Sequence, residues 1–241
     1  MEAFDAALAD RWQAAGARMK AVAERGSAAE SLVEVARQLY QRGWMDGTAG
    51  NLSVRLPEST DEALITASGR SKGALTVADV ARIRIDDASP VEPDGPKPSA
   101  EAAIHAALLR RFGNSGAVVH AHPPYATVVA SRAARGSASP QVRRVEFRDF
   151  ELIKGFHVHD PSRVAVPVFP NWPDVTQVAR DVDAYYADRP AGDPEVLLIA
   201  HHGATAWGPT LESARNALEC IEGLCQLRVL DAIARTTEET S

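Results

Sequence analysis

The sequence contains few cysteines, few aromatic residues and no long hydrophobic run. Its 241 residues include two cysteines, Cys220 and Cys225, which cannot form the disulfide framework of a small secreted protein. Both lie in an apolar helical pattern, which indicates reduced thiols packed in a core. The longest uncharged stretch of the middle region, residues 113–131, contains two histidines and two prolines, and this composition excludes a membrane span. The first thirty residues lack the apolar segment of a signal peptide, so we expect a cytoplasmic protein.

The sequence also has no excess of positive charge. Lysine and arginine together number 26 against 32 aspartate and glutamate residues, a formal net charge of −6. This balance argues against binding to nucleic acid or to an anionic membrane, and it favours a small-molecule partner. With 45% apolar residues the chain can build one core of its own, so a metal site would serve function rather than folding.

The chain divides into three expected parts. Residues 1–26 form an Ala-rich lead segment with helical character, residues 27–235 a single domain, and residues 236–241 a polar tail. Within the domain, apolar alternation and helical periodicity interleave, which predicts an α/β layered fold. The expected strands cover residues 51–56, 63–67, 81–86, 117–122, 164–169 and 195–200, and the expected helices cover residues 27–43, 76–80, 99–109, 123–132, 150–156, 174–186 and the segment after 210. Ser27 with Glu30 has the spacing of a capping box, so the first domain helix is predicted to begin there. Residues 89–98 and 132–141 are predicted loops.

The pair His120 and His122 is the strongest chemical signal. Alternate residues of a strand share one face, so both imidazoles can converge on a single ion. The pattern alone also fits two half-buried strand residues. A third ligand is available in His202, which follows the predicted strand 195–200, and Gly203 permits a sharp turn beside an ion.

Three other histidines are candidates for the same role. His157 and His159 repeat the same spacing, but the turn residues that follow favour semi-exposed positions at a strand edge. His105 lies one helical turn after Glu101 and shares its face, so we expect a residue that packs or supports the site rather than a ligand.

Glu101 lies in the first turn of a helix that Ser99 is expected to cap. A carboxylate there interacts favourably with the helix dipole, and it could equally serve as a general acid/base held by a rigid helix start. The spacing leaves both interpretations open.

Three small polar turns could hold a phosphate group. Residues 48–51, 67–69 and 97–99 offer backbone N–H groups, hydroxyls or an amide at the end of a strand or the start of a helix. Each alone is more often an ordinary turn, but together with a metal site they suggest a phosphorylated substrate. The glycine-rich motifs of dinucleotide and nucleoside triphosphate sites are absent.

The ordered motifs of residues 31–230 together resemble the class II aldolase/adducin family. The matching stretches are GTAGNLSVRL, ITASGRSKGAL, KPSAEAAIH, AVVHAHPPYATVVA, ELIKGF, VPVFPN and HHGATAWG. The resemblance implies a three-layer α/β/α fold around a central mixed, largely antiparallel sheet. It also implies a homo-oligomer, expected to be a tetramer.

The same resemblance implies roles for individual residues. It makes His120, His122 and His202 the ligands of one divalent metal ion, expected to be Zn²⁺, and Glu101 the acid/base carboxylate. It implies that the substrate phosphate is held by Asn51, Ser68, Gly69 and Ser99, with Lys97 assisting.

Three positions depart from the family pattern. Ala100 replaces a second serine found in some members, and His201 stands where glycine or asparagine is commoner. Thr205 replaces an aromatic residue that is frequent in the dehydratases of the family. These departures bear on the shape of the pocket beside the metal and on the substrate.

The stretches ELIKGF, VPVFPN and AWG favour the dehydratase branch of the family. The expected reaction is metal-dependent dehydration of 5-methylthioribulose 1-phosphate to 2,3-diketo-5-methylthiopentyl 1-phosphate in methionine salvage. One alternative is an aldolase or 4-epimerase that acts on another ketose phosphate. A second is a non-catalytic adducin-like binding module, which would not need the full set of histidines, carboxylate and phosphate turns.

Overall fold

The fold alternates helices and strands along the chain, and the computed structural model describes residues 2–135, 141–187 and 193–239. The elements follow in the order α1 (Glu2–Gln41), β1 (Asn51–Arg55), β2 (Glu62–Thr66), η1 (Lys72–Ala74), η2 (Val77–Asp79), β3 (Val80–Arg84), α2 (Ala102–Arg111), β4 (Ala117–Ala121), α3 (Pro124–Ala134), β5 (Arg143–Arg148), η3 (Glu151–Phe156), β6 (Arg163–Phe169), α4 (Val175–Ala187), β7 (Val196–Ile199), β8 (Gly203–Gly208) and α5 (Leu211–Glu239). No helix in these ranges is long and apolar enough to cross a bilayer.

Eight strands form one sheet in the order β3-β2-β1-β4-β8-β7-β6-β5. Every neighbouring pair is antiparallel except β6 and β7, which are parallel. This confirms the expected mixed, largely antiparallel sheet. Strand β4 lies near the centre, between β1 and β8, so its side chains can meet partners from both neighbours.

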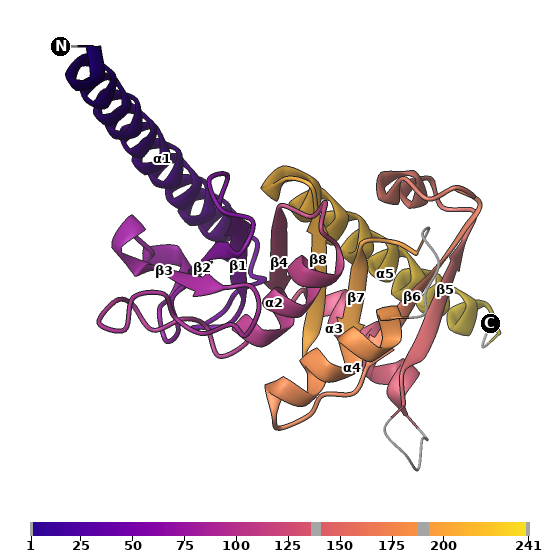
Figure 1. The fold of residues 1–241 in the computed structure, drawn as a ribbon. Helices are drawn as coiled ribbons and strands as arrows, with labels where there is room; N and C mark the ends of the chain where they lie inside the picture. The colour runs from indigo at the N-terminus through magenta and orange to yellow at the C-terminus, as the bar shows by residue number, and fades with distance from the viewer. Residues whose placement is uncertain (1, 136–140, 188–192, 240–241) are drawn as a thin grey trace.

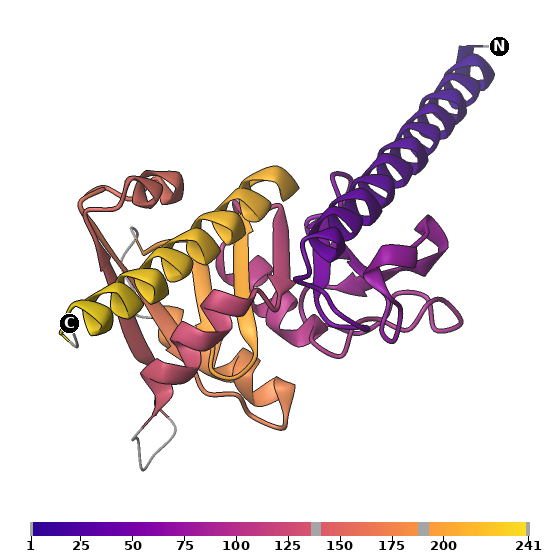
Figure 2. The same cartoon turned by 180° about the vertical axis from the view of Figure 1, so that it is seen from behind.

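Helices cover both faces of the sheet and form the expected three layers. Helices α2 and α4 pack on the face turned to the viewer in Figure 1. Their apolar side chains form one cluster with Val118 of β4 and Trp207 of β8. Helices α3 and α5 cover the opposite face, which Figure 2 shows. The alternation along β4 divides it between these cores: Ala117, Val119 and Ala121 face α3 and α5, and Val118 faces α2 and α4.

The N-terminal helix is longer than predicted. Helix α1 runs without a break through the expected boundary between residues 26 and 27, and its N-terminal part extends away from the sheet (Figure 1). Ser27 therefore does not begin a helix; its carbonyl oxygen accepts a hydrogen bond from the Ser31 hydroxyl inside the continuous helix. The Ala-rich segment before Ser27 has high helix propensity, and the helix continues through Gly26 despite the cost of glycine in a helix interior. At the other end of the chain α5 continues to Glu239, into the segment expected to be a polar tail.

Two strands, β5 and β8, lie outside the strands predicted from the sequence. Strand β8 has glycine at both ends, and the pattern of β5, RRVEFR, buries only Val145 and Phe147. Residues with low strand propensity take part in β8 because the neighbouring strands β4 and β7 hydrogen-bond with it on both sides. Of the predicted loop 132–141, residues 132–134 belong to α3, and residues 136–140 lie outside the described residues.

Candidate metal centre

Three strands place a row of polar side chains on one face of the sheet. Asn51 of β1 and Thr205 of β8 both lie directly opposite His120 of β4 in the strand register. His120 is 1% exposed. Its Nδ1 lies 2.9 Å from the Thr205 hydroxyl oxygen, so Thr205 supports the imidazole. Opposed residues on neighbouring strands are close enough for such side-chain contacts.

His122 lies one residue beyond the end of β4. Its backbone N–H donates to the carbonyl oxygen of Trp44 at 2.8 Å, and Pro123 and Pro124 follow it directly into α3. Proline is suited to the first helical position because its missing N–H would be unpaired there in any case. Strand alternation therefore continues far enough to bring His122 beside His120, even though His122 is not itself in the strand.

His202 reaches the same point from the turn between β7 and β8. The sharp bend is made at His201, whose φ of 58° lies in the left-handed region that glycine and asparagine adopt most readily. Gly203 has a different role from the predicted one: a Cβ atom there would collide with the carbonyl oxygen of Ala121, so the residue allows β8 to approach β4 closely. The side chain of His201 is exposed, and its backbone N–H donates to the Ser131 hydroxyl at 3.0 Å.

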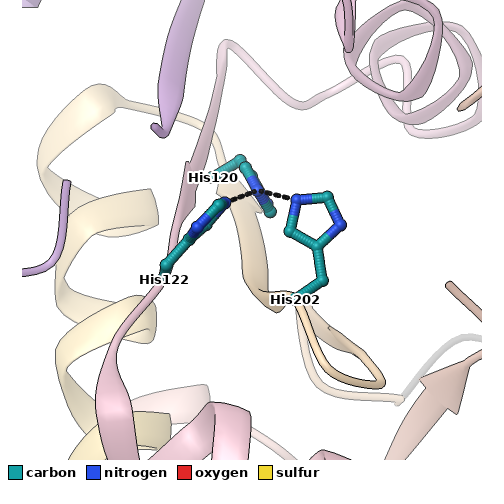
Figure 3. Close-up of side chains that lie close together, drawn as sticks. All are labelled: His120, His122 and His202. Carbon is teal, nitrogen blue, oxygen red and sulfur yellow. Dashed lines mark hydrogen bonds between the residues drawn. The ribbon is translucent and has the colours of Figure 1, made fainter. Parts of the chain in front are cut away.

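The three imidazoles converge on one point (Figure 3). The Nε2 atom of His120 lies 3.1 Å from Nε2 of His122 and 3.3 Å from Nε2 of His202. Two nitrogens bound to one tetrahedral zinc ion are separated by about 3.3 Å, given Zn–N distances near 2.05 Å. Within the described residues, these three histidines are the one group of histidine, cysteine and acidic side chains placed to share a metal ion. The donor set therefore fits a divalent cation.

The contacts of the Nδ1 atoms and the burial of the site both favour metal binding by these histidines. His202 Nδ1 lies 3.2 Å from the Asn171 side-chain oxygen, and His120 Nδ1 contacts Thr205, so both Nε2 atoms are left for an ion. Burial lowers the pKa of His120 to about 3, which keeps the imidazole neutral at physiological pH. Burial also lowers the pKa of His122, and the neighbouring His202 adds to the effect. A neutral imidazole is the form that binds metal.

The carboxylate of Glu101 lies against two of the three imidazoles. Its oxygens are 3.0 Å from His202 Nε2 and 3.3 Å from His120 Nε2, and the Asn51 amide donates to it at 2.6 Å. Burial alone would raise the pKa of Glu101, but the neighbouring His120 and His202 and the Asn51 hydrogen bond lower it well below its usual value. The group is thus an ionised carboxylate within reach of the metal position.

The local structure around Glu101 differs slightly from the prediction. Helix α2 begins at Ala102, so Glu101 occupies the N-cap position rather than the first turn, and its N–H donates to the Ser99 hydroxyl at 3.2 Å. Ser99 thus supports the residue before the helix instead of capping the helix itself. The helix start still fixes the direction of the carboxylate.

The structure brings two of the three polar turns together, residues 67–69 and residues 97–99. Ala67 forms an isolated bridge with Pro98, and the Ser68 N–H donates to the Lys97 carbonyl oxygen at 2.9 Å. Gly69 has a φ of 71°, a conformation that favours glycine. The first turn joins them through Asn51, whose amide is directed at Glu101.

The other histidines lie outside the cluster. His105 is fully buried, and its Nδ1 lies 2.7 Å from the Ser53 hydroxyl oxygen, which supports its interpretation as a packing residue beneath the site. His157 and His159 are exposed in and after the turn that ends η3, rather than at a strand edge.

One charged residue near the site was not singled out from the sequence. Lys72 is 2% exposed, although it lies in the SGRSKGAL stretch among turn residues that predict a solvated side chain. The only signal in the sequence is its place three residues after Gly69 within a matching motif, and this gives no information on burial.

Comparisons with known proteins agree with this geometry. The family model described as "Class II Aldolase and Adducin N-terminal domain" matches residues 30–229. The chain is 38% identical over 194 residues to the methylthioribulose-1-phosphate dehydratase of Microcystis aeruginosa, which covers 80% of this chain and 90% of that protein. Among solved structures, YgbL from Escherichia coli superposes with a TM-score of 0.69 at 28% identity, over 86% of this chain and 90% of that chain.

A further relative is a longer protein. The name of this Nocardia farcinica protein combines methylthioribose-1-phosphate isomerase with methylthioribulose-1-phosphate dehydratase. The match is 46% identical over 196 residues and covers 81% of this chain but only 34% of the relative. The chain thus spans about a third of that relative's length. On the family match and these identities, the chain belongs to the class II aldolase and adducin family.

Proposed function

We propose that this protein is a hydro-lyase that dehydrates 5-methylthioribulose 1-phosphate to 2,3-diketo-5-methylthiopentyl 1-phosphate, a step of methionine salvage. The observation that carries the chemistry is the ionised Glu101 carboxylate 3.0 Å from His202 Nε2, at the edge of a three-histidine site. The choice of substrate rests on the relatives named methylthioribulose-1-phosphate dehydratase. Four of them match at 35–38% identity over 90–97% of their own length.

The residues of the site divide the work of the proposed reaction. A divalent cation held by His120, His122 and His202 would supply Lewis acidity, which would make the hydrogen on C3 of the substrate more acidic. Glu101 takes the proton from C3 and assists departure of the C4 hydroxyl as water. The resulting enol then ketonises to the diketone, so that the net change is loss of one water molecule. Glu101 is suited to this role because the helix start and the Asn51 amide fix its direction.

The phosphate group is proposed to lie against the polar turns. Asn51, Ser68, Gly69 and Ser99 would hold it, with Lys97 assisting. The bridge between Ala67 and Pro98 supports this arrangement, because it places the backbone of residues 68–69 beside that of residues 97–99. Exposed Gly69 allows close approach of an anion to the backbone.

Three finer assignments belong to the same proposal. The metal is Zn²⁺, since three imidazoles and one open position are typical of catalytic zinc. The protein is a homotetramer, for which light scattering should give four times the chain mass of 25.8 kDa. It acts in the cytoplasm, which cell fractionation can test.

The deciding experiment is turnover by the purified protein after its metal has been identified and quantified by mass spectrometry. The substrates are 5-methylthioribulose 1-phosphate, fuculose 1-phosphate, rhamnulose 1-phosphate and ribulose 5-phosphate. Dehydration of the methylthio sugar alone is expected. Cleavage or epimerisation of another sugar would replace the proposed activity with an aldolase or epimerase, and a metal-free, inert protein would favour a binding module.

A further inference from the structure

Lys72 is the one buried lysine of the chain. The sequence contains four lysines, and the other three, Lys20, Lys97 and Lys154, are exposed. A buried ammonium group is costly unless it is paired or hydrogen-bonded, so its position requires an explanation.

The Lys72 ammonium joins two of the polar turns. Its Nζ donates to the carbonyl oxygen of Thr48 at 2.8 Å and to that of Arg70 at 3.0 Å. Thr48 begins the turn that leads to Asn51, and Arg70 directly follows Gly69. The side chain therefore fixes these turns relative to each other, although 24 residues separate Thr48 from Lys72.

The same ammonium lies close to the reacting end of the site. Burial lowers the pKa of Lys72, and the nearby negative charge of Glu101 opposes this effect. The positive charge of Lys72 in turn contributes to lowering the pKa of His122. Lys72 therefore contacts two of the polar turns through hydrogen bonds and interacts electrostatically with Glu101 and His122 at the metal position.

An ammonium group carries three N–H donors, and the two carbonyl oxygens occupy two of them within the described residues. We propose that the third donor of Lys72 binds the phosphate group of the substrate and supplies the fixed positive charge of that subsite. The inference rests on the proposed sugar-phosphate function and adds a residue to it. Lys72 meets the anion inside the protein, whereas Lys97 is exposed to water. A charge-assisted hydrogen bond is stronger where water is excluded.

The first test compares Lys72→Met with Lys20→Met, which makes the same change on the exposed surface of α1. The probe is inorganic phosphate, titrated by calorimetry into each metal-loaded protein. We expect Lys72→Met to retain its metal and to bind phosphate roughly 10- to 100-fold more weakly, because one charged hydrogen bond is lost. Lys20→Met should match the wild type. Equal phosphate affinity in all three proteins would overturn the proposal.

Steady-state kinetics give a second readout. If Lys72 binds the phosphate group throughout the reaction, Lys72→Met should raise KM much more than it lowers kcat. If it only braces the two turns, Lys72→Arg, which keeps the charge and donors, should not restore phosphate affinity beyond that of Lys72→Met. Restoration by Lys72→Arg is the expected result.

A measurement on the wild type decides the matter if the variants do not fold. In protein labelled with ¹⁵N at the lysine side chains, four ammonium signals are possible, and only the buried Lys72 should exchange its protons slowly. Addition of inorganic phosphate should shift this signal, and an unchanged signal at saturating phosphate would overturn the proposal. The calorimetric and NMR experiments both use inorganic phosphate rather than a sugar phosphate. If the dehydratase assignment is wrong, the turnover assay would fail while these two phosphate-binding results would be unaffected.

Discussion

The Nδ1 atom of His120 has a partner that the sequence pattern does not reveal. Thr205 lies opposite it in the register, and the 2.9 Å contact with the hydroxyl engages Nδ1, which leaves Nε2 for a metal. Partners of this kind contribute to metal affinity without touching the ion. Thr205 is therefore part of the support of the three-histidine site.

We predict that Thr205→Val weakens metal binding about 10- to 100-fold, because the His120 ring loses its hydrogen-bonding partner. Competition with a chromogenic chelator measures the effect. Thr66→Val is the matched control: Thr66 is also fully buried in the sheet, but its hydroxyl oxygen accepts the Leu52 N–H and contacts no histidine. Equal metal affinity in the two variants would contradict the role of Thr205.

A second prediction at this scale concerns Glu101. Glu101→Gln preserves the shape of the side chain and removes its ability to take a proton, so turnover should fall about 10²- to 10⁴-fold. Metal content should stay stoichiometric, since the three imidazoles remain. Turnover and metal content are measured on the same preparation. Unchanged turnover would remove Glu101 from the mechanism.

At the scale of elements, α5 fixes the beginning of α3. Glu222 is 6% exposed, and its carboxylate accepts hydrogen bonds from the backbone N–H groups of Tyr125 at 3.1 Å and Ala126 at 2.7 Å. The N-cap residue Pro123 provides no side-chain cap, so a residue from a distant helix satisfies these donors. Because His122 immediately precedes this helix start, α5 also helps to position the His122 imidazole.

Glu222→Ala should lower the free energy of unfolding by about 1–3 kcal/mol, because the buried N–H group of Ala126 and the partly buried N–H group of Tyr125 lose their acceptors. Urea denaturation measures the change. Glu219→Ala on the same helix is the control, since Glu219 forms partly exposed ion pairs with Arg42 and Arg215 and should contribute at most about 1 kcal/mol. A loss in Glu222→Ala no larger than in the control would exclude the capping role.

At the scale of the whole molecule, the metal site links segments far apart in the sequence. His120 and His202 are 82 residues apart, and they meet only when β4 and the β7–β8 turn are folded. A metal ion bound by them therefore favours the folded state by mass action. The free energy of unfolding should therefore depend on whether a metal ion is bound at the site.

Removal of the metal by a chelator should lower the melting temperature by roughly 8–16 °C relative to protein with a thousandfold excess of free ion over Kd. Calorimetry with and without the chelator tests this. His202→Ala is the control, because a protein without the third ligand should respond much less. A wild-type melting temperature that does not change with the chelator would contradict metal binding at this site.

The local pattern of the sequence determined much of this protein. Period-two spacing put His120 and His122 on one side of β4, and apolar periodicity predicted most helices and six of the strands at nearly their observed positions. The ordered motifs identified the family and its three-layer fold. These features depend on neighbours within a few residues, so they can be read along the chain.

Only the tertiary structure decided how these parts meet. The partnership of His120 with Thr205, the burial of Lys72 and the cap from Glu222 all join segments that are distant in sequence. Strand β8 and the uninterrupted α1 went against local signals: β8 is held by pairing on both sides, and the capping-box residues lie inside a longer helix. Spacing along a chain specifies which face a side chain shares, but burial and hydrogen-bond partners are set by the packing of the whole sheet and its helices.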